Sequence, residues 1–129
     1  QALIIDDNPT NLVVLKQALE LEGITPLLYE TPRNIEKILG EVGQVDIVFL
    51  DLEFPNYSGL DLIKELKKDP RLANVPFVAY TVHTSEQNEA HAAGFHSFLG
   101  KPLDVDRFPE QLQRILSGTM TAPAQPTAR

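Results

Sequence analysis

The stretch Val45–Asp51, with the sequence VDIVFLD, decides the fold of this chain. Four apolar residues in a row, Ile47 to Leu50, are followed directly by an acid. A continuous apolar run of this length is typical of a strand that is buried on both faces, as the strands of a parallel sheet are. Asp51 then stands at the carboxyl end of that strand, the edge where open α/β sheets place their binding sites. The stretch therefore predicts a parallel sheet and a functional acid.

Three other apolar runs also end on polar residues. Each run is short, and each is followed by a side chain that can take part in chemistry. They are Ala2–Ile5 before Asp6 and Asp7, Pro76–Tyr80 before Thr81, and Ser97–Gly100 before Lys101. Because parallel strands point the same way, their carboxyl ends share one edge of the sheet. An acid pair, a single acid, a hydroxyl and an ammonium are therefore expected at that edge.

The composition limits the class of protein. With 129 residues we expect one domain, residues 1–118, followed by a disordered tail or linker, residues 119–129. Cysteine is absent, which fits a cytoplasmic location and excludes thiolate metal sites. No apolar stretch approaches the ~20 residues that span a bilayer, so no membrane association is expected. The net charge of −7 disfavours nucleic-acid binding and leaves a metal cation or a basic protein surface as partners.

Strand and helix patterns alternate along the chain. We expect strands at Ala2–Ile5, Ile24–Tyr29, Val45–Leu50, Phe77–Thr81 and Phe95–Leu99, with a helix after each strand. This alternation predicts a parallel sheet with right-handed crossovers and helices on both faces. The expected fold is a (βα)5 flavodoxin-like three-layer α/β sandwich, whose five strands lie in the order 2-1-3-4-5. That order places the first and third strands side by side, which would bring their acids together.

Local signals mark helix starts and a loop. Asn8 suits the N-cap of the first helix and Pro9 suits its first position. Thr31 before Pro32 repeats this signal for the second helix. We expect the segment Leu52–Ser58, which follows the central strand, to be a loop.

The last two helices differ in how firmly they should be held. The helix at Ser85–Ala93 has only alanines as apolar residues, so we expect it to be loosely held. Asp104 or Asp106 is expected to cap the last helix. One apolar face of that helix is expected to carry Val105, Phe108, Leu112, Ile115 and Leu116.

Three carboxylates that lie close together need a positive counter-charge, because they cannot all stay ionised side by side. Asp6, Asp7 and Asp51 are expected to meet in this way. Mg²⁺ prefers oxygen ligands and combines one or two carboxylates with water and phosphate oxygens. Lys101 adds a second positive charge and Thr81 a hydroxyl donor. A carboxylate that faces a metal, an ammonium and a hydroxyl is suited to accept a phosphoryl group.

Taken together, these residues resemble the receiver domain of two-component response regulators. The residues that carry the resemblance are Asp6-Asp7, Asp51, the loop Asp51–Pro55 with Gly59 eight residues after the acid, Thr81 and Lys101-Pro102. The resemblance covers nearly the whole chain. It implies phosphorelay signal transduction, in which a sensor histidine kinase or a histidine phosphotransfer protein is the partner.

The resemblance also implies a role for each acid. Asp51 would be the phosphoacceptor. Asp7, Asp51 and the backbone carbonyl of Glu53 would hold Mg²⁺ or Mn²⁺, with Asp6 acting through bound water. The domain would be a switch that catalyses its own phosphorylation and slow dephosphorylation, and not a metabolic enzyme.

The remaining residues of the pattern would sense the phosphoryl group. Thr81 would swing toward it, and Lys101 would bind a phosphoryl oxygen and form a cis peptide bond with Pro102. Phe98 would be the aromatic switch residue whose rotamer follows Thr81. The output surface would be the fourth helix, the fifth strand and the last helix, and a homodimer could form through it.

Two positions depart from the family's common pattern. Val82 stands after Thr81 where a smaller residue is usual, and it could narrow access to Asp51. Phe54 stands where methionine is frequent, which we expect to matter less. Glu53, Val82 and His83 occupy positions that tune the lifetime of the phosphoryl group in this family.

Two other functions compete with this interpretation. A haloacid-dehalogenase-like phosphatase also forms a phosphoaspartate, but its Asp-x-Asp-Gly-Thr motif follows the first strand, whereas Asp51 follows the third. A receiver-like binding module that is not phosphorylated would be expected to lack the acceptor or the lysine, and Asp51 and Lys101 are both present. A metal nuclease of similar sheet topology is disfavoured by the net charge of −7.

Overall fold

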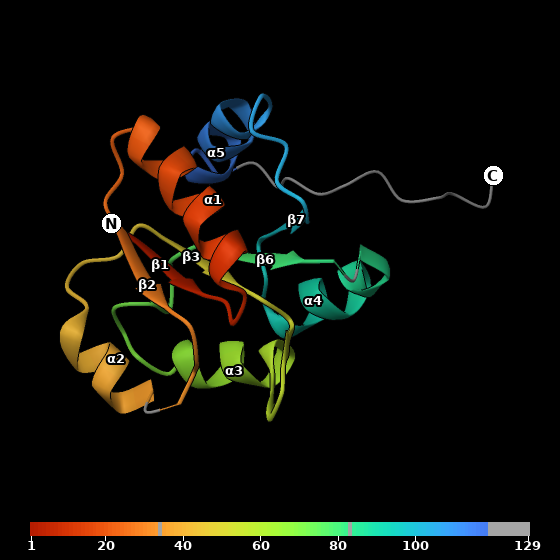
Figure 1. Ribbon diagram of the computed structural model, residues 1–129. Helices are drawn as coiled ribbons and strands as arrows, with labels where there is room; N and C mark the ends of the chain where they lie inside the picture. The colour runs from red at the N-terminus through yellow and green to blue at the C-terminus, as the bar shows by residue number, and fades with distance from the viewer. Residues whose placement is uncertain (34, 83, 119–129) are drawn as a thin grey trace.

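The computed structural model describes residues 1–33, 35–82 and 84–118. Within these ranges strands and helices alternate as the apolar runs predict (Figure 1). The strands are β1 (Ala2–Ile5), β2 (Pro26–Tyr29), β3 (Ile47–Leu50), β4 (Glu53–Phe54), β5 (Tyr57–Ser58), β6 (Phe77–Thr81) and β7 (Ser97–Gly100). The helices are α1 (Pro9–Leu21), α2 (Ile35–Glu41), α3 (Gly59–Leu66), α4 (Gln87–Ala93) and α5 (Phe108–Leu116), with a 3₁₀ turn at Thr84–Glu86.

Five strands form one parallel sheet in the order β2-β1-β3-β6-β7. This order confirms the predicted flavodoxin-like arrangement 2-1-3-4-5. β1 lies beside β3 with Ile5 opposite Leu50, so the residues that follow these two strands are neighbours. Helices α1 and α5 cover one face of the sheet, and α2, α3 and α4 cover the other (Figure 1).

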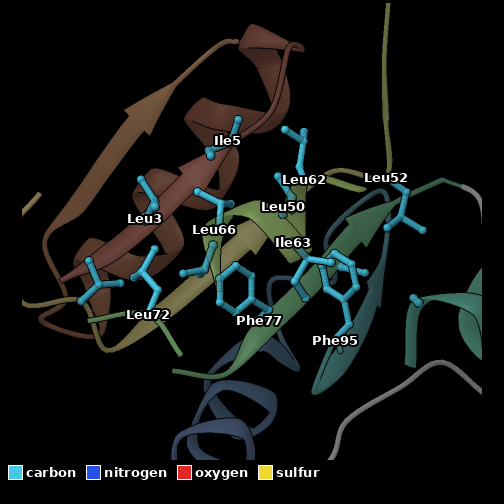
Figure 2. Close-up of a cluster of buried hydrophobic side chains, with 14 of the residues drawn as sticks. Leu3, Ile5, Leu50, Leu52, Leu62, Ile63, Leu66, Leu72, Phe77 and Phe95 are labelled. Carbon is cyan, nitrogen blue, oxygen red and sulfur yellow. The ribbon is translucent and has the colours of Figure 1, made fainter. Parts of the chain in front are cut away.

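The core consists of two apolar clusters, one on each face of the sheet. In the cluster under α3, Leu3, Ile5 and Leu50 from the sheet pack against Leu62, Ile63 and Leu66 from the helix (Figure 2). The rings of Phe77 and Phe95 meet edge to face in this cluster, with their centroids 6.4 Å apart. Burying each large apolar side chain contributes roughly 1.5–3 kcal/mol, so the apolar strands fix the position of the edge that carries the acids.

Two helices begin at side chains that cap them, and the sequence predicts the first of these caps. The Asn8 side chain accepts hydrogen bonds from the backbone N–H groups of Thr10 and Asn11, at 2.9 and 3.2 Å, and so caps α1. Ser58 caps α3 by accepting from the N–H of Leu60 at 3.2 Å. These caps satisfy backbone donors that the first turn leaves without partners.

The last helix corrects the sequence-based prediction. Asp104 accepts from the N–H groups of Asp106 and Arg107, but these bonds cap a turn before α5 and not the helix itself. Val105 lies in that turn and is 57% exposed, while Leu116 is the final helical residue and is 45% exposed. Phe108, Leu112 and Ile115 are buried as predicted. Val105 and Leu116 are not, because Val105 precedes the helix and Leu116 is its last residue.

The segment after β3 also differs from the expected loop. It forms a two-stranded antiparallel hairpin in which Glu53 pairs with Ser58 and Phe54 with Tyr57. A Pro55-Asn56 turn joins the two strands, as the turn preferences of these residues allow. Among the described residues, none of the helices combines the length and the apolar character that crossing a bilayer requires.

Candidate functional site

Asp6, Asp7 and Asp51 meet at the carboxyl edge of the sheet, where β1 and β3 run side by side. The backbone N–H of Asp51 donates to the carbonyl of Ile5 at 3.2 Å, so the strand pairing continues up to the acids. One carboxylate oxygen from each acid lies within 4.8 Å of the corresponding oxygens of the other two. Asp6 and Asp51 are buried, and Asp7 is exposed. The structure thus brings together the three acids that the strand order predicts to be neighbours.

Lys101 places a positive charge among these carboxylates. Its Nζ lies 2.7 Å from Asp6 Oδ2 and donates a hydrogen bond to Asp51 Oδ2 at 3.0 Å. The Lys101 side chain is 6% exposed, so the ion pairs form largely out of water, where charges interact more strongly. The lysine follows β7, whose last residue pairs with Thr81 at the end of β6. The Lys101–Pro102 peptide bond is cis, as the resemblance implies.

The environment of Asp6 suits a carboxylate that shares a cation. Burial raises the pKa of this carboxyl above its ordinary value, and the nearby negative charge of Asp51 adds to the rise. The adjacent ammonium of Lys101 and the hydrogen bond from the backbone N–H of Asn8 oppose the rise. Asp6 Oδ1 accepts from the Asn8 N–H at 2.9 Å. The buried Oδ2 has the Lys101 ion pair but no aligned hydrogen bond from any described residue. That oxygen retains the capacity to face a divalent cation.

Thr81 and Phe98 lie on two paired strands beside the acids. Thr81 is fully buried at the end of β6, and its backbone carbonyl accepts from the Lys101 N–H at 3.0 Å. Phe98 is buried in β7 opposite Ala79, in the cluster that α3 and α4 cover. Strand alternation places Ala79 and Thr81 on the same face of the sheet. The hydroxyl and the aromatic ring therefore belong to the face that carries α4.

Two of the three positions predicted to tune the site, Glu53 and Val82, lie among the described residues beside it. The backbone N–H of Glu53 approaches Asp51 Oδ1 at 3.4 Å, and the Glu53 side chain is exposed. Val82 is 64% exposed at the mouth of the site. His83 lies outside the described residues. Of the two other histidines, His91 is exposed on α4, and His96 contacts the hydroxyl of Ser97 at 2.8 Å.

Sequence reasoning missed Tyr80 as a neighbour of the site, and it named Gly59 without predicting what that glycine contacts. The ring of Tyr80 lies under the Lys101 ammonium, with Nζ 5.0 Å from the ring centroid. Gly59 packs so tightly on the backbone of Asp51 that a β-carbon there would overlap the carbonyl oxygen. The available signals are an aromatic residue directly before Thr81 and a glycine at the start of a helix. Neither of them indicates which residue the side chain or backbone contacts.

The position of Asp51 disfavours the haloacid-dehalogenase-like phosphatase, because Asp51 follows β3 and the motif of that enzyme follows the first strand. Its motif of two acids followed by glycine and threonine is also missing, since Phe54 and Pro55 follow Glu53. Nothing among the described residues favours that enzyme.

Comparison with known proteins identifies the family. Residues 2–113 match the response regulator receiver domain family. The chain is 29% identical over 120 residues to the polar-differentiation response regulator DivK of Brucella anthropi, covering 88% of this chain and 94% of DivK. Receiver domains interact with histidine kinases or phosphotransfer proteins.

Solved structures agree with the fold. A CheY-like receiver domain from Methylobacillus flagellatus is 30% identical, with a TM-score of 0.77 over 89% of this chain and 97% of that one. TrrA from Thermotoga maritima, solved in complex with Mg²⁺-BeF, is 24% identical, with a TM-score of 0.74 over 88% of this chain and 96% of that one. The family match, the sheet order and the cluster of acids around a lysine lead to one conclusion. The chain belongs to the receiver domain family of response regulators, the phosphoacceptor switches of two-component phosphorelay signalling.

Proposed function

We propose that Asp51 accepts a phosphoryl group from a histidine of a sensor kinase or a phosphotransfer protein. The observation that carries this proposal is the pairing of buried carboxylates with a buried ammonium, since Lys101 Nζ lies 3.0 Å from Asp51 Oδ2 and 2.7 Å from Asp6 Oδ2. A carboxylate can act as a nucleophile toward phosphorus, and a fixed cation beside it balances the charge of the incoming oxygens. We therefore assign Asp51 as the acceptor and Lys101 as a phosphoryl-binding residue.

In the transfer step, a carboxylate oxygen of Asp51 forms a bond to phosphorus while the bond between phosphorus and the imidazole nitrogen of the donor breaks. The bonding electrons leave with the imidazole, which takes up a proton, and no atom is oxidised or reduced. Negative charge spreads over the three equatorial oxygens during this step. Lys101 provides the charge and Thr81 the hydroxyl that we assign to these oxygens.

The same acids form the proposed cation site. Asp6, Asp7, Asp51 and the backbone carbonyl of Glu53 would hold Mg²⁺ or Mn²⁺. Three carboxylate oxygens within 4.8 Å of one another, and the buried Asp6 Oδ2 without an aligned hydrogen bond, fit the oxygen ligands that these hard cations prefer. When bound, the cation would neutralise charge at the acceptor. The Mg²⁺-BeF complex of TrrA supports this choice of cation.

Phosphorylation would then change the surface formed by α4, β7 and α5. Thr81 would turn toward the phosphoryl group, and Phe98 would follow it. Helix α4 has one buried alanine, Ala90, and Gln87 as its buried residues, so little apolar area holds it in place. A loosely held helix beside the site is suited to move when the hydroxyl moves. A homodimer through this surface is part of the same proposal.

Loss of the phosphoryl group by hydrolysis would act as a slow timer. Glu53, Val82 and His83 are the residues that we assign to setting its rate. Val82 is 64% exposed at the rim, where its side chain could restrict the approach of a donor or of water. We retain residues 1–118 as the receiver domain and residues 119–129 as a tail or linker. A location in the cytoplasm remains a prediction.

The proposal is tested by measuring the intact mass after incubation with acetyl phosphate and Mg²⁺. The wild-type protein is expected to gain one phosphoryl group, and Asp51→Asn is expected to gain none. Asp61→Asn is a matched control, because Asp61 is an exposed acid on α3 outside the acidic cluster. A wild-type protein that stays unmodified, in the presence and absence of Mg²⁺, would favour the alternative of a receiver-like binding module.

A further inference from the structure

Tyr80 provides an aromatic face for the lysine of the site. Lys101 Nζ lies 5.0 Å from the centroid of the Tyr80 ring, within the roughly 6 Å over which a cation is attracted to an aromatic face. The Tyr80 ring is 1% exposed and the Lys101 side chain 6% exposed, so water is largely excluded from the contact. A desolvated cation–π contact of this kind is stronger than one at the surface.

The position of Tyr80 follows from the sheet. It is the residue before Thr81 on β6, so strand alternation sends its side chain to the opposite face, into the cluster that α1 and α5 cover. Tyr80 pairs with Leu99 in β7, two residues before Lys101. The strand register therefore brings the ring under the lysine that follows β7.

The ring, and not the hydroxyl, makes the contact with the lysine. The hydroxyl oxygen of Tyr80 is buried and makes no aligned hydrogen bond within the described residues. A buried hydroxyl without a partner is unfavourable, so it does not explain a tyrosine at this position. The aromatic face differs from the carboxylates of Asp6 and Asp51 in one respect. It attracts the ammonium without a full negative charge, so it does not depend on what those acids bind.

We propose that Tyr80 is a positioning residue for Lys101: its ring holds the ammonium at the acceptor, so that phosphorylation of Asp51 requires an aromatic side chain at position 80 but no hydroxyl. This inference rests on the proposed function and adds a residue to it. Asp6 and Asp51 attract Lys101 strongly only while their charge is available. The ring holds the ammonium in place when that charge is shared with other groups.

Three variants separate the ring from the hydroxyl and from packing. Tyr80→Phe keeps the ring, Tyr80→Leu removes it, and Val78→Ala loosens the same cluster without touching Lys101, since Val78 is buried on the same face of β6. The initial rate of phosphorylation by acetyl phosphate is measured at saturating Mg²⁺. Tyr80→Phe and Val78→Ala should keep the wild-type rate, and Tyr80→Leu should be slower by about thirtyfold, the order expected if a desolvated cation–π contact is lost. A Tyr80→Leu rate equal to wild type, or a Tyr80→Phe rate as low as that of Tyr80→Leu, overturns the proposal.

A second measurement does not require phosphorylation. An aromatic ring shifts the NMR signals of protons above its face to lower frequency, so the Lys101 CεH₂ signals should be shifted in the wild-type protein and in Tyr80→Phe. Lys67 provides an internal control, because its Nζ lies 5.5 Å from the centroid of the Phe77 ring and its shift should be unchanged in every variant. Unshifted Lys101 signals in the wild-type protein contradict the positioning role even if Tyr80→Leu does not fold. Shifted signals in a protein that takes up no phosphoryl group would instead refute the proposed function.

Discussion

Gly59 lies directly against the backbone of Asp51. A β-carbon at position 59 would overlap the carbonyl oxygen of Asp51 and lie 2.7 Å from the α-carbon of Leu52. The N–H of Gly59 also donates to the carbonyl of Leu52 at 2.7 Å. Backbone atoms cannot move aside as the end of a flexible side chain can. Any larger residue at position 59 must therefore displace the backbone of Asp51 and Leu52.

Gly59→Ala is therefore expected to destabilise the protein and to slow phosphorylation of Asp51. Overpacking typically lowers the free energy of unfolding by about 1–3 kcal/mol, and a clash with backbone belongs at the upper end. Urea unfolding and the rate of phosphorylation by acetyl phosphate measure the two effects. Gly40→Ala is the matched control, because Gly40 lies in α2. Apart from its chain neighbours and the backbone of that helix, no heavy atom of the described residues lies within 4 Å of the added carbon. The free energy of unfolding of that control should rise by about 0.5–1 kcal/mol, because alanine favours a helix more than glycine does. Equal stability of the two variants would contradict the close packing of Gly59.

Mg²⁺ is expected to stabilise the folded protein through the three acids. Binding to the folded state alone raises the free energy of unfolding by about 2.7 kcal/mol at a cation concentration near 100 times Kd. Asp7→Asn should remove most of this increase in the free energy of unfolding, because it replaces one of the three clustered carboxylates with a neutral amide. Asp7 is exposed, so the substitution leaves the core unchanged. Thermal unfolding with Mg²⁺ and with a chelator measures the difference. Glu22→Gln, at an exposed acid after α1, should keep the full gain. An undiminished Mg²⁺ effect in Asp7→Asn would exclude Asp7 as a ligand.

Because the hydroxyl of Tyr80 is buried, the free energy of unfolding should depend on pH in the alkaline range. Burial raises the pKa of Tyr80 from 10.0 to about 12, and the charges of Asp6 and Asp51 add to the rise. The nearby backbone N–H of Leu103, which makes no aligned hydrogen bond with the hydroxyl, opposes the rise in pKa with the smallest effect. Because the folded pKa is the higher one, this contribution to stability is complete below pH 10 and is lost as the pH rises to about 12.

Tyr80→Phe cannot ionise at this position, so it tests the alkaline dependence. Its melting temperature should fall less than that of the wild-type protein above pH 10. Near neutral pH the variant should be more stable by about 1 kcal/mol, because a buried hydroxyl without a hydrogen bond is removed. Thermal unfolding followed by circular dichroism gives both values. Parallel alkaline curves for the two proteins would show that the Tyr80 hydroxyl is not buried as described.

An ion pair between Asp69 and Arg71, after α3, makes the free energy of unfolding depend on pH in the acidic range. Arg71 donates two side-chain hydrogen bonds to Asp69, at 3.1 and 2.8 Å, and these bonds lower the pKa of the Asp69 carboxyl below 3.8. Arg71 also donates to the carbonyls of Leu39 and Val42 at the end of α2, at 2.6 and 3.0 Å. Because the folded pKa of Asp69 is the lower one, the contribution is present above pH 3.8 and is lost as the pH falls further.

Asp69→Asn should therefore unfold at lower urea concentration than the wild-type protein at neutral pH, and the difference should shrink below pH 4. Urea titrations between pH 3 and pH 7 measure it. Glu65→Gln breaks an exposed pair with Lys68 and should change little at any pH. A difference that stays constant down to pH 3 would show that Asp69 acts through packing and not through its charge.

The sequence predicts the acids better than their surroundings. Asp6, Asp7 and Asp51 follow short apolar runs, and strand order alone makes them neighbours at one edge. The contact between Tyr80 and Lys101 was not predicted. It depends on the register of β6 and β7 and on a side-chain rotamer, and no local pattern encodes either of these.

Errors in the prediction came from the ends of elements. The sequence pattern predicts Val105 on the apolar face of the last helix, because it predicts a helix that begins near Asp104. The helix begins at Phe108. In the structure the Asp104 carboxylate accepts hydrogen bonds within a turn that precedes the helix. The helix is therefore shorter than predicted, and Val105 is exposed. Hydrophobic periodicity indicates that a helix exists, but capping bonds decide where it begins.

Chemical trapping tests the central assignment most directly. After incubation with acetyl phosphate and Mg²⁺, sodium borohydride reduces an aspartyl phosphate to the corresponding alcohol, homoserine, and peptide mass spectrometry locates that change. Our account predicts one modified position, Asp51, and no signal in Asp51→Asn. Modification at Asp6 or Asp7 in the wild-type protein, or modification elsewhere that persists in Asp51→Asn, would contradict it.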